Sequence, residues 1–277
     1  MCSANVAGND RRGWIIPIGG AEKKIKSSAI LSRFVELCGA DAARIVIIPT
    51  ASQLEDTGER YEEVFGKIGA GQLDIVNFST RSDCQDPRLL AVLEQATGIF
   101  FTGGNQQRLA DIIGDTLSAQ QIRHGNSQGV HVAGTSAGAA FLSRQMIRAG
   151  RTGSTPKRGM VNLSDGLGLS NSVIIDQHFR ERDRLGRLLT ALSHNPCATG
   201  IGVDEDTAAF IDPDNRIEVV GSGGVTVVDT SGMTQPTQAA VQKGKPVSLT
   251  GIKLHILLCG DRYDLGTRTV WAKSEQN

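Results

Sequence analysis

Short runs of β-branched and aromatic residues alternate with helix-like segments in the first half of this sequence, and this alternation constrains the fold most. The strand-like runs are "WIIPI" (14–18), "RIVIIP" (44–49), "LDIVNF" (73–78), "GIFFT" (98–102) and "VHVA" (130–133). The helix-like segments lie between them, near 28–38, 59–68, 87–96 and 106–123. Strands separated by helices pair in parallel through crossover connections. We therefore predict an α/β fold with a doubly wound, mostly parallel sheet and helices on both faces.

The pattern changes after about residue 200. The stretches "GIGVDEDTAAFI", "RIEVVGSGGVTVVD" and "KLHILLCG" predict several strands that are interrupted by glycine, with few helices. We expect them to form an antiparallel extension of the same sheet near the C-terminus. Residues 149–171 are rich in Gly, Ser and Pro and form the longest candidate loop. We expect a flexible N-terminus over 1–13 and a single α/β domain over 14–277.

Charge and hydropathy narrow the possible partners. The chain has 29 basic and 29 acidic residues, so no global field attracts nucleic acid or an anionic membrane. No segment approaches the roughly 18 apolar residues of a membrane span, and the first residues contain no apolar core of signal-peptide length. We expect a cytoplasmic protein with no nucleic-acid and no membrane partner.

The stretch "VHVAGTSAGAAFL" (130–142) places Ser136 between Gly134 and Gly138 in a G-x-S-x-G spacing. A strand-like run precedes the serine and a helix-forming run follows it, which is the context of a nucleophile elbow. In that geometry the backbone N–H of Ala137 can stabilise an oxyanion. The alternative is a chance match in a chain with 33 glycines, which the strand and helix context disfavours.

A serine nucleophile needs a base, most often histidine. His178 lies in "VIIDQHFRERDR", where a strand-like run ends and a polar cluster begins. Parallel sheets place their chemistry at such strand ends. The other histidines are better explained as structural or exposed residues: His124, His131, His194 and His255.

A carboxylate should fix the tautomer of the imidazole. "GIGVDEDTAAF" offers Asp204, Glu205 and Asp206 directly after an apolar strand, and alternation would turn Glu205 away from its two neighbours. The alternatives are a solvated strand end and a weak metal site. We predict no metal, because no histidine lies nearby at ligand spacing. We also predict no cofactor, because the chain has no P-loop and no G-x-G-x-x-G after a strand.

Several motifs in order resemble one known family. "PIGGAE", "GERY", "FTGGNQQRL", "GTSAGAA", "DQHF" and "GVDEDT" together are similar to the cyanophycinase family, from about Trp14 to near residue 270. These serine peptidases are related to aspartyl dipeptidases and have a fold similar to class I glutamine amidotransferases. The order serine, histidine, glutamate also differs from that of an α/β-hydrolase, in which the acid precedes the histidine.

The resemblance implies hydrolysis of cyanophycin, a poly-aspartate with an arginine on each side-chain carboxyl, to β-Asp-Arg dipeptides. It implies that Ser136 is the nucleophile, His178 the base and Glu205 the residue that orients it. It further implies an oxyanion hole and a set of substrate contacts, and it suggests a homodimer. The oxyanion hole would use Gly104 and Ala137, and the substrate contacts would be Gln106, Asp176, Gln177, Arg182, Arg184 and Arg187.

The arginines have a physical meaning, since guanidinium groups bind carboxylates in a bidentate manner. The alternative is a solvated helix face neutralised by Glu181 and Asp183. Asn105 stands where the family has an acidic residue, which bears on substrate preference. Two other functions remain open: an α-aspartyl or isoaspartyl dipeptidase with the same triad, and a catalytically silent binding module.

Overall fold

The computed structural model describes residues 12–24, 28–234 and 241–271. Five parallel strands form one half of a nine-stranded sheet, in the order β1-β5-β4-β2-β3. Their bounds are Ile15–Ile18 (β1), Arg44–Ile48 (β2), Gln72–Ile75 (β3), Gly98–Phe101 (β4) and His131–Thr135 (β5). Each of these strands lies where the sequence predicts one, so the parallel α/β core is confirmed.

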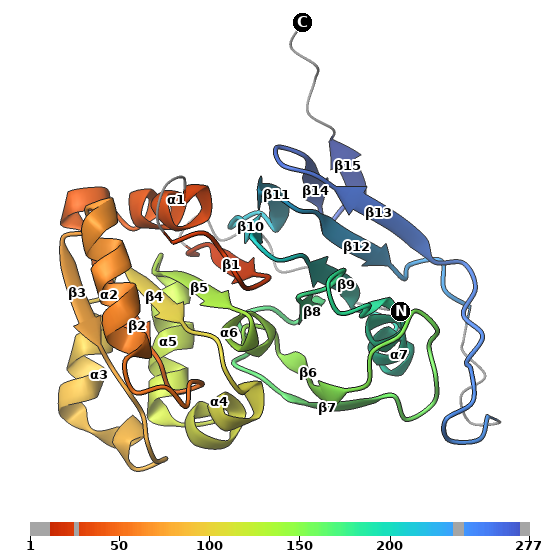
Figure 1. Ribbon diagram of the computed structural model, residues 1–277, viewed down its shortest axis with the longest axis horizontal. Helices are drawn as coiled ribbons and strands as arrows, with labels where there is room; N and C mark the ends of the chain where they lie inside the picture. Colours follow the sequence, from red (N-terminus) through yellow and green to blue (C-terminus); the bar gives the residue numbers. More distant parts are fainter. Residues whose placement is uncertain (1–11, 25–27, 235–240, 272–277) are drawn as a thin grey trace, which may run out of the picture.

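Helices cover both faces of the parallel half (Figure 1). Alternate residues of each strand enter different cores: Ile45 and Ile47 face one, whereas Val46 and Ile48 face the other. The first core is closed by α1 (Ala29–Leu37) and α2 (Thr57–Ile68). The second is closed by α3 (Pro87–Glu94), α4 (Gln106–Ile113), α5 (Leu117–Ser127) and α6 (Ala137–Phe141). Two 3-10 turns, η1 (Ala40–Ala42) and η2 (Asp83–Gln85), complete this half.

The segment expected as one helix over 106–123 is two helices. Helix α4 ends at Ile113 with Gly114 as its C-cap, and the next residue, Asp115, has a φ of 56°. Thr116 then caps α5, because its side chain accepts a hydrogen bond from the N–H of Ala119. A left-handed residue followed by a capping threonine ends one helix and starts another.

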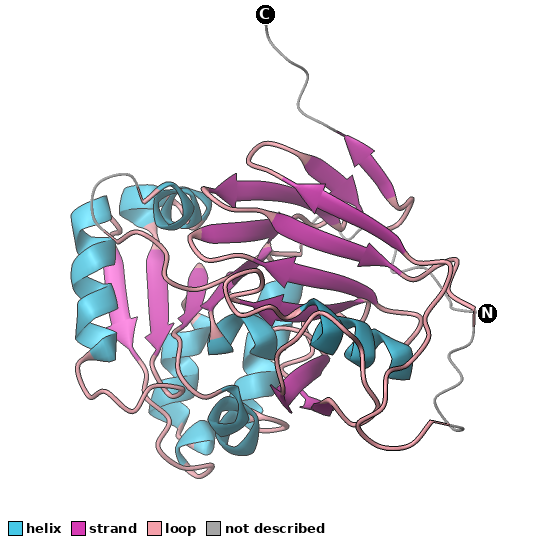
Figure 2. Cartoon of the chain, turned by 45° about the vertical axis from the view of Figure 1, so that its right-hand side comes forward, coloured by secondary structure: helices cyan, strands magenta, loops and turns pink. Residues whose placement is uncertain are grey.

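The antiparallel half of the large sheet continues from β1. Strand β10 (Thr207–Ile211) pairs with β1, and β11 (Arg216–Gly221), β14 (Arg262–Asp264) and β15 (Thr269–Trp271) follow outward, all antiparallel. These strands are the predicted antiparallel extension. Figure 2 shows that they carry little helical cover compared with the parallel half.

The remaining late strands correct the prediction of a single extended sheet. A second sheet has the order β13-β12-β9-β8, with β8 (Val173–Gln177), β9 (Thr199–Val203), β12 (Val225–Asp229) and β13 (Lys253–Leu257). Strands β8 and β9 are parallel, and the other pairs are antiparallel. The chain leaves this sheet in a turn after β9, where Asp206 has a φ of 50°, and enters the large sheet at β10.

The second sheet packs on both sides. Helix α7 (Leu185–His194) covers one face, where it contacts Ile174 and Val228. The alternate residues Val173, Ile175 and Val227 belong to the same core as α3 to α6. The two sheets therefore share one hydrophobic core, and the ends of their strands can meet.

Two further expectations are corrected or lie partly outside the described residues. The candidate loop 149–171 contains β7 (Val161–Asp165), which forms an antiparallel hairpin with β6 (Gln145–Gly150). Of the N-terminal segment expected to be flexible, residues 1–11 lie outside the described ranges, and Arg12 donates a hydrogen bond to the carbonyl of Asp212. Within the described ranges, no helix is both long and apolar enough to cross a membrane.

Candidate active site

Ser136 occupies a sharp turn between β5 and α6. Its backbone has φ 52° and ψ −112°, a conformation that residues other than glycine rarely adopt. Its N–H donates to the carbonyl of Ile18 (3.0 Å). Glycines on both sides make the turn possible. A Cβ on Gly134 would lie 2.5 Å from the backbone of Gly138, and a Cβ on Gly138 would lie 2.5 Å from the carbonyl of Phe101. The backbone is thus that of a nucleophile elbow.

Two hydrogen bonds connect Ser136, His178 and Glu205. The Oγ of Ser136 lies 2.8 Å from Nε2 of His178, and Nδ1 of the same imidazole lies 2.6 Å from Oε1 of Glu205. An ionised carboxylate can only accept, so Nδ1 donates to Glu205 and Nε2 is left to accept the serine hydroxyl proton. This is the tautomer that a general base requires.

The three side chains come from two different sheets. Ser136 follows β5 of the large sheet, whereas His178 follows β8 and Glu205 follows β9 of the second sheet. The turn after β1 connects the sheets at this point. The carbonyl of Gly19 accepts from the N–H of His178 (2.9 Å), and the carbonyl of Gly20 accepts from the N–H of Asp206 (2.8 Å).

The surroundings of His178 set its protonation. Burial lowers the pKa of the imidazole below its ordinary value of 6.5, and the positive charges of Arg182 and Arg184 lower it further. The hydrogen bond and the negative charge of Glu205 act in the opposite direction. The net lowering of the pKa favours the neutral imidazole at pH 7.

The two aspartates beside Glu205 have partners of their own. Asp204 is buried and accepts from the backbone N–H groups of Arg180 (3.1 Å) and Gly224 (3.1 Å). Asp206 accepts from Ser222 (2.6 Å) and forms an ion pair with Lys23 (3.0 Å). The described residues contain no group of three or more His, Cys, Asp or Glu side chains that could hold a metal ion.

Of the residues implied for the oxyanion hole, Ala137 directly follows the serine and Gly104 lies in the loop after β4. Ala137 is the first residue of α6 and is buried. Gly104 lies between β4 and α4 with a φ of 143°, and a Cβ there would lie 2.0 Å from the carbonyl of Ala51. Its neighbour Gly103 lines the same cavity as Ser136. Only glycine allows the chain to pass this close at position 104.

Asp176 and two of the arginines form a buried cluster. Asp176 is 1% exposed and Arg187 is 4% exposed, and they form a bidentate pair in which Nε and Oδ2 are 2.6 Å apart. Arg184 is also buried, reaches Asp176 at 3.4 Å and donates to the side chain and carbonyl of Gln177. Burial lowers the pKa of Arg184 to about 10. These arginines are therefore neither on a solvated helix face nor open to solvent.

The other two implied substrate contacts differ in exposure. Arg182 is exposed, and its charge lowers the pKa of His178. Gln106 is half-buried at the start of α4, and its amide donates to the carbonyls of Ile147 (3.3 Å) and Arg148 (3.0 Å) on β6. The amide of Gln106 thus connects α4 to the β6–β7 hairpin.

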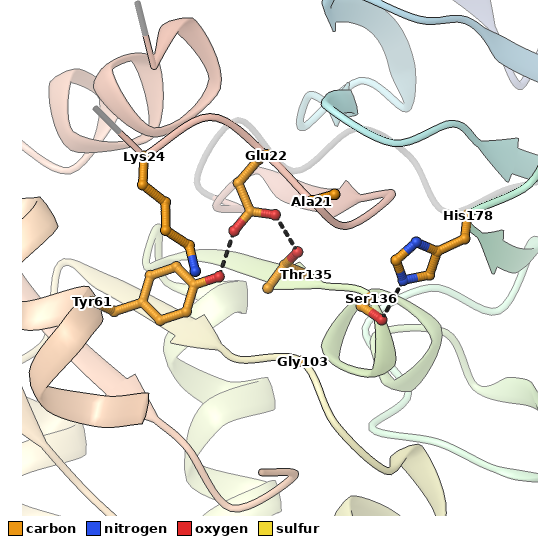
Figure 3. Close-up of a pocket in the computed structure, with 8 residues that line it drawn as sticks. All are labelled: Ala21, Glu22, Lys24, Tyr61, Gly103, Thr135, Ser136 and His178. Atoms are coloured by element: carbon orange, nitrogen blue, oxygen red, sulfur yellow. Dashed lines mark hydrogen bonds between the residues drawn. The ribbon is translucent and has the colours of Figure 1, made fainter. Parts of the chain in front are cut away.

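The structure adds residues that the sequence analysis did not single out. A cavity of about 470 Å³ opens beside Ser136 and His178 (Figure 3). Its other lining residues are Ala21, Glu22, Lys24, Tyr61, Gly103 and Thr135. The motifs "PIGGAE" and "GERY" contain Glu22 and Tyr61. Nothing local to either motif indicates that the two side chains meet, because they are 39 positions apart.

A serine on a strand-to-helix elbow, with an imidazole on its hydroxyl and a carboxylate behind it, is the arrangement found in serine hydrolases. Comparison with known proteins gives the family. The chain belongs to peptidase family S51, whose model matches residues 15–219. It is therefore a peptidase, and the resemblance stated from the motifs is confirmed.

Individual relatives agree with the family. The chain is 41% identical over 261 residues to a protein named cyanophycinase from Trichormus variabilis, covering 92% of this chain and 87% of the relative. It is 42% identical over 259 residues to a cyanophycinase from Geminocystis herdmanii, covering 92% and 95%. A solved peptidase structure from an acI-B1 Actinobacterium matches with a TM-score of 0.65 and 23% identity, covering 87% of this chain and 98% of that one. At this identity the likeness to the solved structure shows the fold alone.

Proposed function

We propose that this peptidase hydrolyses cyanophycin to β-Asp-Arg dipeptides, acting as a serine-type exopeptidase. The observation that carries the proposal is the hydrogen-bonded series Ser136, His178 and Glu205, of which Ser136 and His178 line a cavity. The substrate is suggested by the relatives named cyanophycinase, which align with more than nine-tenths of the chain.

In the first half of the proposed reaction, Oγ of Ser136 attacks the backbone carbonyl carbon of an aspartyl residue. Nε2 of His178 takes the hydroxyl proton, and Glu205 stabilises the imidazolium that forms. The N–H groups of Ala137 and Gly104 would donate to the oxyanion. Collapse of the tetrahedral intermediate breaks the peptide C–N bond, and His178 gives its proton to the leaving amine. An acyl-enzyme remains on Ser136.

In the second half, a water molecule attacks the acyl-enzyme. His178 takes a proton from the water and returns it to Oγ of Ser136 as the ester bond breaks. The carboxylic acid product leaves and the free serine is regenerated. The neutral, lowered-pKa state of His178 suits both steps, because each begins with proton abstraction.

The proposed substrate contacts fall into two groups. Arg182 is exposed and can bind free carboxylates of the polymer directly, and Gln106 is half-buried at the start of α4. Asp176, Arg184 and Arg187 are buried, and both arginines pair with Asp176, so we assign them a positioning role, in which they hold Gln177 and the end of β8 next to His178.

The test is to incubate the protein and its Ser136→Ala variant with cyanophycin granules and to identify the soluble products by mass spectrometry. We expect β-Asp-Arg from the wild type, and a rate lower by on the order of 10⁶ from the variant. Asp-X and isoaspartyl dipeptides are assayed in parallel. If a serine-directed probe labels Ser136 but only dipeptides are cleaved, the polymer is not the substrate. A protein that cleaves nothing and takes no label would be a silent binding module.

We also propose that residues 14–277 act as one peptidase domain, that the fold is related to the class I glutamine amidotransferases, and that the protein is a cytoplasmic homodimer. The shared core of the two sheets supports the first of these. The others rest on the resemblance to the family. Sedimentation velocity and cell fractionation test the last.

A further inference from the structure

Glu22 carries a buried carboxylate in the wall of the cavity that holds Ser136. Glu22 is 4% exposed and lines the cavity together with Tyr61 and Thr135. One oxygen accepts from the Tyr61 hydroxyl, and the other accepts from Thr135 Oγ1 (2.6 Å) (Figure 3). Thr135 precedes the nucleophile in the chain, so this carboxylate lies close to the reacting centre.

No described cation pairs with this carboxylate. Its two hydrogen-bond donors are neutral hydroxyls, and the ion pairs among the described residues do not include Glu22. Lys24 is the cavity's own cation, and its ammonium lies over the Tyr61 ring, 4.4 Å from the centroid. A carboxylate taken out of water without a cation is costly, and two hydroxyls occupy only part of its hydrogen-bonding capacity.

The cavity therefore presents two charged groups to a substrate: the buried carboxylate of Glu22 and the ammonium of the exposed Lys24. An arginine attached through its α-amino group has the complementary pair, a guanidinium and a free α-carboxylate. We propose that Glu22 binds the guanidinium of the arginine branch and that Lys24 faces the branch carboxylate. The inference rests on the proposed function and makes Glu22 a specificity-determining residue of that reaction.

A structural role for Glu22 is the competing explanation, because the same carboxylate joins Tyr61 of α2 to Thr135 of β5. The two explanations differ in one measurable respect. A purely structural glutamate would affect every substrate equally, whereas a guanidinium receptor affects only substrates that carry the charge.

The experiment compares two synthetic aspartyl oligomers with the same backbone, one with arginine branches and one with citrulline branches. Citrulline keeps the length and the branch carboxylate but replaces the cation with a neutral urea group. We expect Glu22→Gln to lower kcat/KM for the arginine oligomer by about 10- to 100-fold, since a charged hydrogen bond of this kind is removed. The rate for the citrulline oligomer should change by less than about threefold.

Two further variants serve as controls. Tyr61→Phe removes one donor but keeps the charge of Glu22, so the preference for arginine over citrulline should persist. Lys24→Glu changes an exposed residue, which makes a folded variant the expected result. It should raise the ratio of arginine to citrulline turnover, because a second negative charge joins the pocket. This variant tests the pocket even if Glu22→Gln does not fold.

The outcomes separate the inference from the proposed function. Equal losses on both oligomers with Glu22→Gln, or an unchanged ratio with Lys24→Glu, would overturn the guanidinium site while leaving cyanophycin hydrolysis intact. A wild-type protein that cleaves neither oligomer, although Ser136 reacts with a serine-directed probe, would overturn the proposed function itself.

Discussion

Gly20 lies against the imidazole of His178 so closely that a Cβ at position 20 would be 2.4 Å from Cε1 of the ring. The same glycine accepts the N–H of Asp206 through its carbonyl and has a φ of 104°. The absence of a side chain at Gly20 thus sets how near the second sheet brings its histidine to Ser136.

Gly20→Ala should displace the imidazole and lower kcat/KM by about 10², the loss expected from a misplacement of roughly 1 Å. The control is Gly69→Ala, where φ is 102° but no atom lies within 4 Å of the added Cβ. Both variants carry the strain of a left-handed alanine, about 1 kcal/mol, so the midpoint temperature of thermal unfolding should fall in both. Only Gly20→Ala should lose activity, and a fully active Gly20→Ala would refute this account.

Glu205→Gln should lower kcat by about 10³ to 10⁴, because an amide no longer selects the tautomer with the proton on Nδ1 of His178. Steady-state kinetics with the arginine-branched aspartyl oligomer as substrate measure the effect. Asp206→Asn is the matched control, since Asp206 is adjacent in sequence but bonds to Ser222 and Lys23. We expect less than a tenfold change for the control, and equal losses in the two variants would contradict the role of Glu205.

The pH dependence follows from the lowered pKa of His178. The base acts only when neutral, so kcat/KM should fall as the pH drops through the folded-state pKa, and this acid limb should lie below 6.5. Arg182→Gln removes a positive charge that lowers this pKa, so the limb should move to higher pH. Arg180→Gln changes a neighbouring exposed arginine and should leave the limb in place. A profile with no acid limb at any pH below 6.5 at which the protein stays folded would exclude His178 as the base.

The buried Asp176–Arg187 pair should matter for stability. Asp176→Asn leaves the guanidinium of Arg187 buried without its counter-charge, and we expect a loss of about 3 to 5 kcal/mol in the free energy of unfolding. Urea denaturation measures it. Arg180→Leu removes an exposed guanidinium whose contacts to Glu181 (3.8 Å) and Asp204 (3.7 Å) are long, and it should cost about 1 kcal/mol or less. A stability change for Asp176→Asn as small as that of the control would mean that the cluster does not stabilise the fold.

The sequence predicts the five parallel strands well, because each is a short apolar run between helical segments. It also indicates Ser136, which lies between a strand-like run and a helix-forming run, and His178, which lies where a strand-like run ends and a polar cluster begins. The separate second sheet could not be predicted. Strands such as β9 and β10 are equally apolar, and which sheet each joins is decided by the turn at Asp206, through contacts distant in sequence.

Glu22 and the arginine cluster show a second limit. A single glutamate after a strand is ordinary, and its burial depends on Tyr61 and Thr135, which lie far along the chain. The spacing of the arginines does indicate that they are buried. Arg184 and Arg187 are three residues apart and share a helical face with Leu188, which points into a core rather than toward solvent.

Because Ser136 follows a strand of one sheet and His178 and Glu205 follow strands of the other, the three residues are synthesised and folded at different times. Ser136 and its elbow leave the ribosome 42 positions before His178 and 69 positions before Glu205. A partly made chain that has completed the five parallel strands would expose the serine with no imidazole to accept its proton. If the three residues act as proposed, hydrolytic competence would then appear only when the second sheet docks against the first.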